Sequence, residues 1–226
     1  MDTTPEIMSD FFDRRVDTYE AHMLNQVTDA VAFYHETALL VSAEEGLDLL
    51  DLGCGTGLEL DEIFKMKPDI NVTGIDLSTA MLERLQAKHT DKAKQLHLIN
   101  GSYFDIDLGY EKFSTAVSVQ TMHHFTYEKK RKLYSKIYRC LRNHSCYIET
   151  DYIARSQQEE DTFLVKRSHL KSKQDPDGKL YHIDIPCTVG NQLRLLQDAG
   201  FEQVTCYRRY HQTALFIAKK LNGASV

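Results

Sequence analysis

The chain lacks the features that place a protein in a membrane or in a disulfide framework. None of its apolar runs approaches the roughly 20 residues that a membrane-spanning helix requires. The five cysteines are scattered, and no two of them form a Cys-x-x-Cys pair, so neither a zinc finger nor a set of disulfides is indicated. The first residues lack the basic flank and apolar core of a secretory signal. We therefore expect a cytoplasmic protein with reduced thiols and no membrane partner.

Clustered prolines and an excess of basic residues are also missing. The four prolines do not form a linker, and 226 residues match a single domain, which we place at 1–226. The formal net charge of -6 argues against a general binder of polyanions, because phosphate neutralisation needs clustered Lys and Arg. The short basic and aromatic segment 207–210 fits an edge strand better than a nucleic-acid surface. Nucleic acid is thus disfavoured as a partner, and the sequence leaves a homodimer open.

The apolar pattern along the chain predicts an α/β fold. Helical spacing over residues 9–44 predicts an N-terminal helical cap within 1–45. Beyond it, apolar runs typical of strands alternate with helical patterns, which predicts a mostly parallel sheet of seven strands with helices on both faces. The last two strands predict an antiparallel hairpin. The expected strands are 47–52, 72–75, 96–99, 115–119, 146–150, 204–210 and 214–219, and the expected helices are 58–65, 78–89, 127–141 and 188–199.

One polar stretch, residues 151–187, interrupts this alternation. It carries a charged helical piece at 159–168 and the turn-forming run Asp-Pro-Asp-Gly at 175–178. Because ligands of open α/β sheets bind beyond the carboxyl ends of the strands, an insertion that follows the strand 146–150 lies on the substrate side. We expect it to form an acceptor pocket together with the segment around Phe12 and Tyr19. The alternative is a solvated loop without a catalytic role.

A glycine-rich turn at Leu49–Gly57 joins a buried strand to a helix. Glycines let a ligand approach the backbone closely, and the helix start offers N–H groups, although such a turn can also be purely structural. Leu58 stands where a dinucleotide-binding fingerprint needs its third glycine, and the Gly-Lys-Ser/Thr of a phosphate loop is missing. Asp51 precedes the glycines and Asp76 ends the next strand. The two acids suit a ligand that carries a positive charge and a ribose.

These motifs resemble those of a known enzyme class. Leu-Asp-Leu-Gly-Cys-Gly-Thr-Gly at 50–57, followed by Gly-Ile-Asp-Leu-Ser at 74–78, resembles the first two motifs of class I S-adenosylmethionine-dependent methyltransferases. Residues 113–125 resemble the fourth strand of that family with its following segment, and 197–219 resemble its final helix and hairpin. The resemblance implies a Rossmann-like fold, S-adenosylmethionine as cofactor, and direct in-line methyl transfer to a small polar molecule.

The resemblance also implies roles for individual residues. Asp51 would reach the amino group of the cofactor, Asp76 its ribose, and Gln120 its methionine end. Ser102 departs from the family, which commonly has Asp at that position, so a charge-assisted hydrogen bond to the adenine is lost there. The residues so assigned to cofactor binding are Asp51, Gly53, Cys54, Gly55, Gly57, Asp76, Leu77, Met81, Ser102, Tyr103 and Gln120.

Catalytic groups are harder to assign, because a sulfonium methyl group is already activated and needs chiefly an aligned acceptor. A hydroxyl or ammonium acceptor needs a general base, and five residues are candidates by position: Tyr19, His123, His124, Tyr152 and His182. No metal is expected. Two adjacent histidines do not present a shared set of ligands unless distant acids such as Asp151 or Asp184 join them.

Two alternatives to a small-molecule methyltransferase remain open. The chain resembles, more distantly, the carboxy-S-adenosylmethionine synthases in its Arg15–Val16 segment and at Gln120. The arginine that binds the carboxylate in that family would lie in the last helix, near Arg194. The other alternative is a tRNA-modification enzyme.

Overall fold

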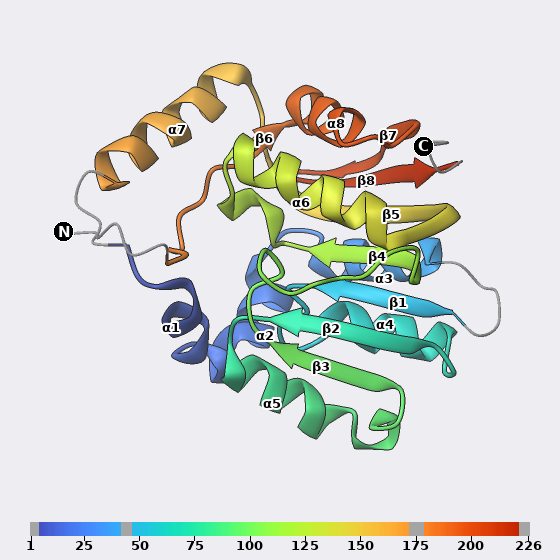
Figure 1. Cartoon of the computed structure of the whole chain (residues 1–226). Helices are drawn as coiled ribbons and strands as arrows, with labels where there is room; N and C mark the ends of the chain where they lie inside the picture. Colours follow the sequence, from blue (N-terminus) through green and yellow to red (C-terminus); the bar gives the residue numbers. More distant parts are fainter. Residues whose placement is uncertain (1–4, 42–46, 172–178, 222–226) are drawn as a thin grey trace.

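The computed structural model describes residues 5–41, 47–171 and 179–221, and its centre is one eight-stranded sheet (Figure 1). The strand order is β3-β2-β1-β4-β5-β8-β7, and β6 pairs with β5 outside this path. Among the described strands, β8 runs opposite to all the others, so its pairings with β5 and β7 are antiparallel and the remaining pairings are parallel. The strands are β1 Asp48–Leu52, β2 Asn71–Asp76, β3 Leu96–Asn100, β4 Phe113–Val119, β5 Leu141–Ala154, β6 Cys187–Thr188, β7 Gln203–Tyr210 and β8 Thr213–Lys220.

Helices cover both faces of the sheet (Figure 1). Two of them begin where the sequence predicts a cap: the Ser78 hydroxyl accepts from Met81 N at 3.1 Å, and the Thr188 hydroxyl accepts from Asn191 N at 3.3 Å. The helices are α1 Met8–Asp13, α2 Val16–Gln26, α3 Ala30–Leu40, α4 Leu58–Met66, α5 Thr79–Lys88, α6 Tyr127–Cys140, α7 Gln157–Lys171 and α8 Val189–Asp198, with 3-10 turns η1 Thr90–Lys92 and η2 Met122–His124.

Each face of the sheet has its own hydrophobic core, because successive side chains of a strand point to opposite faces. Leu50 and Leu52 of β1 pack with α6 and α8, whereas Leu49 packs with α3, α4 and α5. The central strands are buried on both sides, which explains their nearly continuous apolar sequences. This packing fixes the carboxyl ends of β1, β2 and β4 side by side.

The predicted fold class is confirmed, including the C-terminal hairpin of β7 and β8. The structure differs around β5, which already begins at Leu141 rather than at the expected residue 146. β5 continues past the expected end at 150 to Ala154, and its end pairs with β6, an eighth strand that the sequence did not indicate. Ile153 lies opposite Cys187, so the polar stretch leaves and rejoins the sheet through one short parallel pair. The expected turn at 175–178 lies outside the described residues. Within them, no helix has the length and apolar character to cross a bilayer.

Candidate active site

The glycine loop follows β1 and is held against β2. Gly53 N donates a hydrogen bond to the Ile75 carbonyl at 2.7 Å, and all three glycines have positive φ angles. They differ in what a side chain would meet. A Cβ on Gly53 would lie 2.6 Å from Thr121 Oγ1 and one on Gly57 2.4 Å from Leu85 Cδ1, whereas one on Gly55 would have only Tyr19 Cε1 within reach, at 4.0 Å. Gly53 and Gly57 thus permit packing, and Gly55 leaves space beside the loop.

Asp76 connects this loop to the end of β2. One of its carboxylate oxygens accepts from Gly55 N at 2.9 Å, and the other accepts from Ser78 N at 2.8 Å. Burial raises the pKa of Asp76, and these backbone N–H groups only partly oppose that rise. A carboxylate oxygen can accept two hydrogen bonds, so Asp76 retains acceptor capacity for hydroxyl groups of a ligand.

Asp51 lies behind the loop, fully buried, with Glu59 of α4 as its neighbour. Among the described residues, neither carboxylate oxygen of Asp51 has a hydrogen-bond partner of normal geometry. Burial raises the pKa of Asp51 to about 7, and burial together with the Asp51 charge raises the pKa of Glu59 well above its usual value. A buried carboxyl pair, with neither Asp51 nor Glu59 in an ion pair among the described residues, fits a ligand whose positive charge is bound nearby.

A small cavity of about 50 Å³ opens beside the loop. It is lined by seven of the eleven residues assigned to cofactor binding, together with residues of the N-terminal helices and η2. Asp51, Cys54, Gly57 and Ser102 are not among its lining residues. The lining residues are Met8, Phe12, Tyr19, Gly53, Gly55, Asp76, Leu77, Met81, Tyr103, Gln120, Thr121 and His124.

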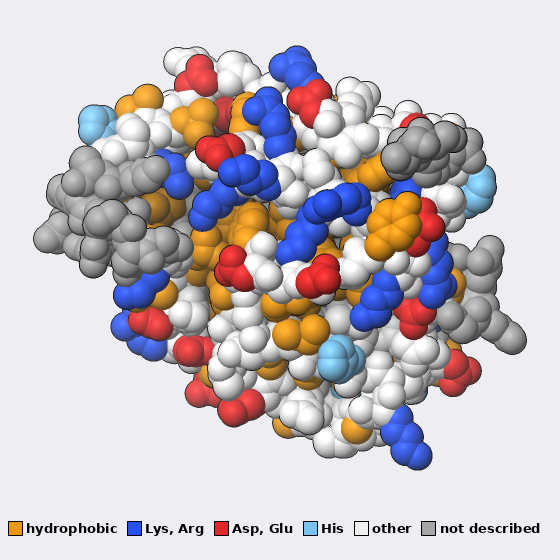
Figure 2. Space-filling model, in the orientation of Figure 1, with side chains coloured by type: hydrophobic (Ala, Val, Ile, Leu, Met, Phe, Trp, Pro, Cys, Tyr) orange, Lys and Arg blue, Asp and Glu red, His pale blue; other side chains and the backbone are white. Residues whose placement is uncertain are grey.

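Ser102 lines a different hollow, of about 830 Å³, between α6 and α7. Phe104 and Tyr127 lie in this hollow, and Lys132 and Arg167 are among its basic lining residues. Figure 2 shows blue basic side chains around an apolar depression on this face. The Ser102 hydroxyl accepts from Phe104 N at 3.2 Å, so it stabilises the turn after β3.

Sequence reasoning did not single out Met8 or Thr121, and both line the small cavity. Thr121 follows Gln120, and its hydroxyl donates to the Val119 carbonyl at 3.0 Å. Its position directly after a predicted strand end was the available signal. Met8 carried no such signal, because α1 reaches the cavity only through its packing beside α5. There Asp13 accepts from the Ser78 hydroxyl at 2.5 Å.

A second cavity, of about 900 Å³, adjoins the first. Phe12, Tyr19, Gln120 and His124 line both, so the two spaces meet at these four side chains. The larger cavity is bounded by α1, α2, η2, the turn between β7 and β8, and the chain that precedes β6. Its further lining residues include Phe11, Arg15, His123, Tyr152, His182, Asp184, His211 and Thr213.

The wall between α1 and β6 is formed by two segments that are far apart in the sequence. Met8 N donates to the Leu180 carbonyl at 2.9 Å, and His182 N donates to the Glu6 carbonyl at 3.0 Å. The His182 ring stacks on Phe11 with 3.6 Å between ring centroids. Burial and the neighbouring His124 lower the pKa of His182 to about 4, so its imidazole is neutral at physiological pH. His182 therefore has the protonation state of a general base.

The two candidate histidines of η2 face acids. His123 Nδ1 lies 2.7 Å from Asp151 Oδ1, and His124 Nδ1 lies 3.2 Å from Asp184 Oδ1. Burial lowers the pKa of His123, but the carboxylates of Asp151 and Asp184 outweigh it and raise the pKa overall. Burial and the nearby His123 lower the pKa of His124. Ile185 N donates to the His123 carbonyl at 2.8 Å, which fixes the segment that carries Asp184.

Tyr19 lies where the two cavities meet. Burial, followed by the charges of Glu59 and Asp76, raises the pKa of Tyr19 far above the usual tyrosine value. Its phenol therefore stays protonated at physiological pH and can donate a hydrogen bond. Arg194, the candidate carboxylate-binding residue of α8, is an exposed side chain whose Nη1 lies 3.4 Å from Asn191 Oδ1. It lines neither of these two cavities.

The parallel sheet with one reversed strand, and a glycine loop coupled to an acid at the end of β2, define a class I, Rossmann-like fold. Similar folds include human N-acetylserotonin methyltransferase in complex with S-adenosylmethionine (16% identity, TM-score 0.65, covering 93% of this chain and 57% of that one). Another is Haemonchus contortus phosphoethanolamine N-methyltransferase 2 (17% identity, TM-score 0.70, covering 95% of this chain and 60% of that one). Its structure is a complex with phosphomonomethylethanolamine and S-adenosylhomocysteine.

Residues 49–144 match the family model of a methyltransferase domain. The part of the chain from β1 through α6 is thus similar to a methyltransferase domain. A curated relative over nearly the whole length is the carboxy-S-adenosyl-L-methionine synthase of Nautilia profundicola, which is 27% identical over 224 residues, covering 92% of this chain and 94% of the relative.

Proposed function

We propose that the chain methylates a small polar molecule bound in the cavity of about 900 Å³. The observation that carries this proposal is the junction of the two cavities at Phe12, Tyr19, Gln120 and His124. An acceptor in the large cavity would meet the reactive end of a cofactor held by the glycine loop. When bound, S-adenosylmethionine supplies a methyl group on a positively charged sulfur. The protein then has to bind, orient and shield the reactants.

The side chains around the junction support these tasks. α1 covers the site with Phe12, and the pairing of segments 6–8 and 180–182 closes the wall, so water is excluded from the reacting atoms. Tyr19 donates a hydrogen bond with its protonated phenol. His182, neutral and next to the cavity, is our choice for the group that takes a proton from a hydroxyl or ammonium acceptor.

The lining of the large cavity supports a polar acceptor. Arg15, His182, Asp184 and the amide of Gln120 offer charges and hydrogen bonds, while Phe11 offers an aromatic face. We further propose that residues 151–187 act as a substrate-side element, because Tyr152, His182 and Asp184 all come from this stretch. The N-terminal segment 1–45 acts as the cap over the same cavity, within one methyltransferase domain of 226 residues.

Calorimetry and mass spectrometry test this proposal. The purified chain should bind S-adenosylhomocysteine, and a screen of small hydroxyl, amine and carboxylate compounds should reveal one that becomes heavier by a methyl group. His182→Ala should lower the turnover of that acceptor at least tenfold, while the dissociation constant for S-adenosylhomocysteine stays within about threefold, less than 1 kcal/mol. Unchanged turnover in this variant would remove His182 from the reaction.

A second candidate function is synthesis of a carboxylated cofactor, favoured by the full-length similarity to the Nautilia profundicola enzyme. Such an enzyme would need a cation for the added carboxylate. Arg15 is the arginine among the described residues that line the large cavity, and it pairs with Glu6 at 3.1 Å. The mass of the nucleoside that co-purifies with the chain separates the two functions. The unmodified cofactor or its homocysteine product supports methylation, whereas a carboxylated cofactor supports the synthase.

A further inference from the structure

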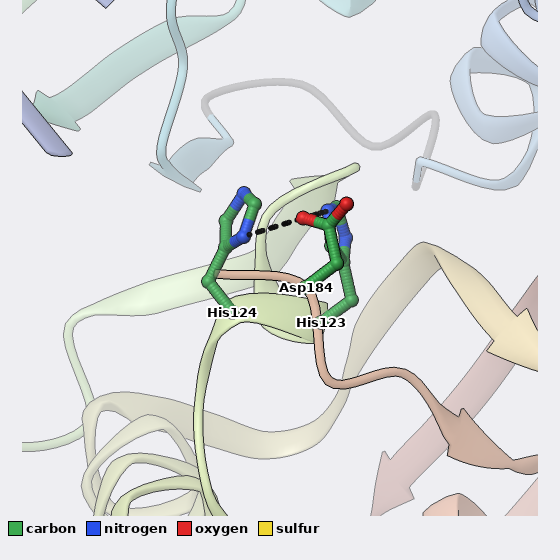
Figure 3. A group of neighbouring side chains, drawn as sticks. All are labelled: His123, His124 and Asp184. Carbon is green, nitrogen blue, oxygen red and sulfur yellow. Dashed lines mark ion pairs between the residues drawn. The ribbon is translucent and has the colours of Figure 1, made fainter. Parts of the chain in front are cut away.

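The large cavity holds a group of donor atoms that methyl transfer does not require. One donor atom from each of His123, His124 and Asp184 lies within 4.8 Å of the other two. Figure 3 shows the three side chains turned toward one another, the histidines from η2 and Asp184 from the chain that leads to β6. Adjacent histidines alone do not form a metal site. Here the fold supplies the missing acid from a distant part of the sequence.

The distances suit ligation of one ion. Ligand atoms about 2.1 Å from an ion in tetrahedral arrangement lie about 3.4 Å from one another. Asp184 Oδ1 lies 3.7 Å from His123 Nε2 and 3.2 Å from His124 Nδ1. Both separations are within a few tenths of an ångström of the required value. Asp184 Oδ1 is thus placed to share an ion with both imidazole nitrogens.

A second carboxylate prepares His123 as a ligand. Asp151 Oδ1 lies 2.7 Å from His123 Nδ1, and both side chains are buried. When the imidazole donates its Nδ1 proton to Asp151, the lone pair of the neutral ring is at Nε2, on the side of Asp184. Histidines that bind metals in proteins almost always donate their other N–H to such an oxygen. Asp151 and Asp184 also place two negative charges around the cluster.

The second histidine, His124, is buried and poorly hydrogen-bonded at Nδ1. The His124 side chain is more than nine-tenths buried, and its residue is 7% exposed. Its Nδ1 faces Asp184 Oδ1 at 3.2 Å, but this contact lacks the geometry of a normal hydrogen bond, and Nδ1 has no other hydrogen-bond partner among the described residues. A buried polar atom that is poorly satisfied is costly, so a ligand at this position would stabilise it. Asp184 is 44% exposed and lines the cavity, which leaves the outer side of the cluster accessible.

We propose that His123 Nε2, His124 Nδ1 and the Asp184 carboxylate bind one divalent transition-metal ion, with its remaining coordination positions open to the acceptor cavity. Two imidazoles and one carboxylate suit Zn²⁺, Co²⁺ or Fe²⁺ rather than Mg²⁺ or Ca²⁺, which prefer oxygen ligands. The open positions would bind an oxygen or nitrogen of an acceptor and orient it. The site does not depend on the proposed methylation, because ion binding is measured without cofactor or acceptor.

Metal titration of the full chain tests the site directly. The protein, prepared without a polyhistidine tag and freed of metal by a chelator, is titrated with Co²⁺ and followed by visible absorption. Zn²⁺ is then added as a competitor. We expect one ion per chain, a Co²⁺ spectrum typical of four or five nitrogen and oxygen ligands, and displacement by Zn²⁺.

Variants assign the ligands. Asp184→Ala and His124→Gln should each weaken Co²⁺ binding at least a hundredfold, and Asp151→Asn should weaken it about 10- to 100-fold by its effect on His123. Two controls should keep the affinity within about threefold: His35→Gln, an exposed histidine paired with Glu62, and His22→Gln, an exposed histidine that lines the same cavity. Circular dichroism and binding of S-adenosylhomocysteine establish that each variant is folded.

Two results would overturn the proposal. The first is wild-type protein that binds S-adenosylhomocysteine but neither Co²⁺ nor Zn²⁺ at micromolar concentration. The second is an ion whose affinity is unchanged in folded Asp184→Ala, which would place it elsewhere. Wild-type protein that binds the ion but not S-adenosylhomocysteine would instead contradict the cofactor assignment and leave the metal site intact.

Discussion

The cofactor side of the active site is built from neighbouring strands and loops, whereas the acceptor side joins segments that are distant in the sequence. On the cofactor side, Asp76 and the loop after β1 are joined by the Gly55–Asp76 hydrogen bond across two adjacent strands. On the acceptor side, α1, η2 and the chain before β6 meet only after folding. The cofactor side is therefore visible in the sequence as a motif, whereas the residues of the acceptor side are scattered along the chain. Variants on the two sides should therefore separate cofactor binding from acceptor turnover.

The largest effect is expected at Gly55. Gly55→Val places a branched side chain at a φ of 48°, which only glycine adopts easily, and directs it toward Tyr19 and the small cavity. We expect binding of S-adenosylhomocysteine to weaken more than a hundredfold by calorimetry. Gly190→Val is the control, because a Cβ there meets nothing within 4 Å. Normal cofactor binding by folded Gly55→Val protein would show that the loop is only a structural turn.

The next effect is expected at Asp76. Asp76→Ala should cost about 1.5 to 3 kcal/mol of cofactor binding, because hydrogen bonds to a charged acceptor are lost. Asp76→Asn keeps the shape of the side chain and one acceptor oxygen, so it should fall between the wild type and the alanine variant. Equal dissociation constants for all three proteins would contradict the assignment of Asp76 to the ribose.

A smaller effect, dependent on pH, is expected at Asp51. Its pKa of about 7 means that it holds a proton below that pH, and a cationic ligand favours the ionised form. Asp51 must lose its proton when the cofactor binds. The affinity for the cofactor should therefore rise by up to about tenfold between pH 6 and pH 7 and become constant at higher pH. Calorimetry in buffers of different ionisation enthalpy detects the released proton. Asp51→Asn should remove the dependence.

The smallest effect is expected at Tyr19, which lies on the boundary between the two sides. Tyr19→Phe removes a hydroxyl but keeps the ring, so cofactor binding should weaken by about 0.5 to 1.5 kcal/mol. The pH profile of acceptor turnover should keep its shape, because the phenol is not the base. A profile that loses its rise with pH in this variant would assign proton abstraction to Tyr19 and contradict the role given to His182.

Much of the fold could be predicted from the sequence because its signals are local. The alternation of strand-like and helical patterns, the capping residues Ser78 and Thr188, and the glycine loop each depend on a few neighbouring residues. The eighth strand could not be predicted. Cys187–Thr188 forms a strand only because it finds the end of β5, so its pairing is a property of the assembled sheet. The extension of β5 has a related cause, because Asp151 and Tyr152 pair with β8 and only Ile153 and Ala154 pair with β6.

On the cofactor side, the sequence predicts the motif, whereas packing sets the role of each residue within it. The sequence by itself determined that a glycine loop and two acids stand at the ends of neighbouring strands, because chain order and strand length fix that geometry. The three glycines are equivalent in the sequence, and only packing against Thr121, Leu85 and the cavity gave each a different role. Packing likewise placed Ser102 beside α6 and α7 rather than in the small cavity.

On the acceptor side, the arrangement and the protonation states of the residues depend almost entirely on the tertiary structure. The sequence determined that His123 and His124 are adjacent and that acids occur at 151 and 184. It did not determine that these acids would approach the histidines from two sides, since that depends on β5 and on the chain before β6 folding back over η2. Burial then set the protonation states, with a neutral His182 and a His123 held by Asp151. The sequence shows which residues are adjacent in the chain. Their spatial neighbours, their burial and the charges around them arise only when distant segments pack together.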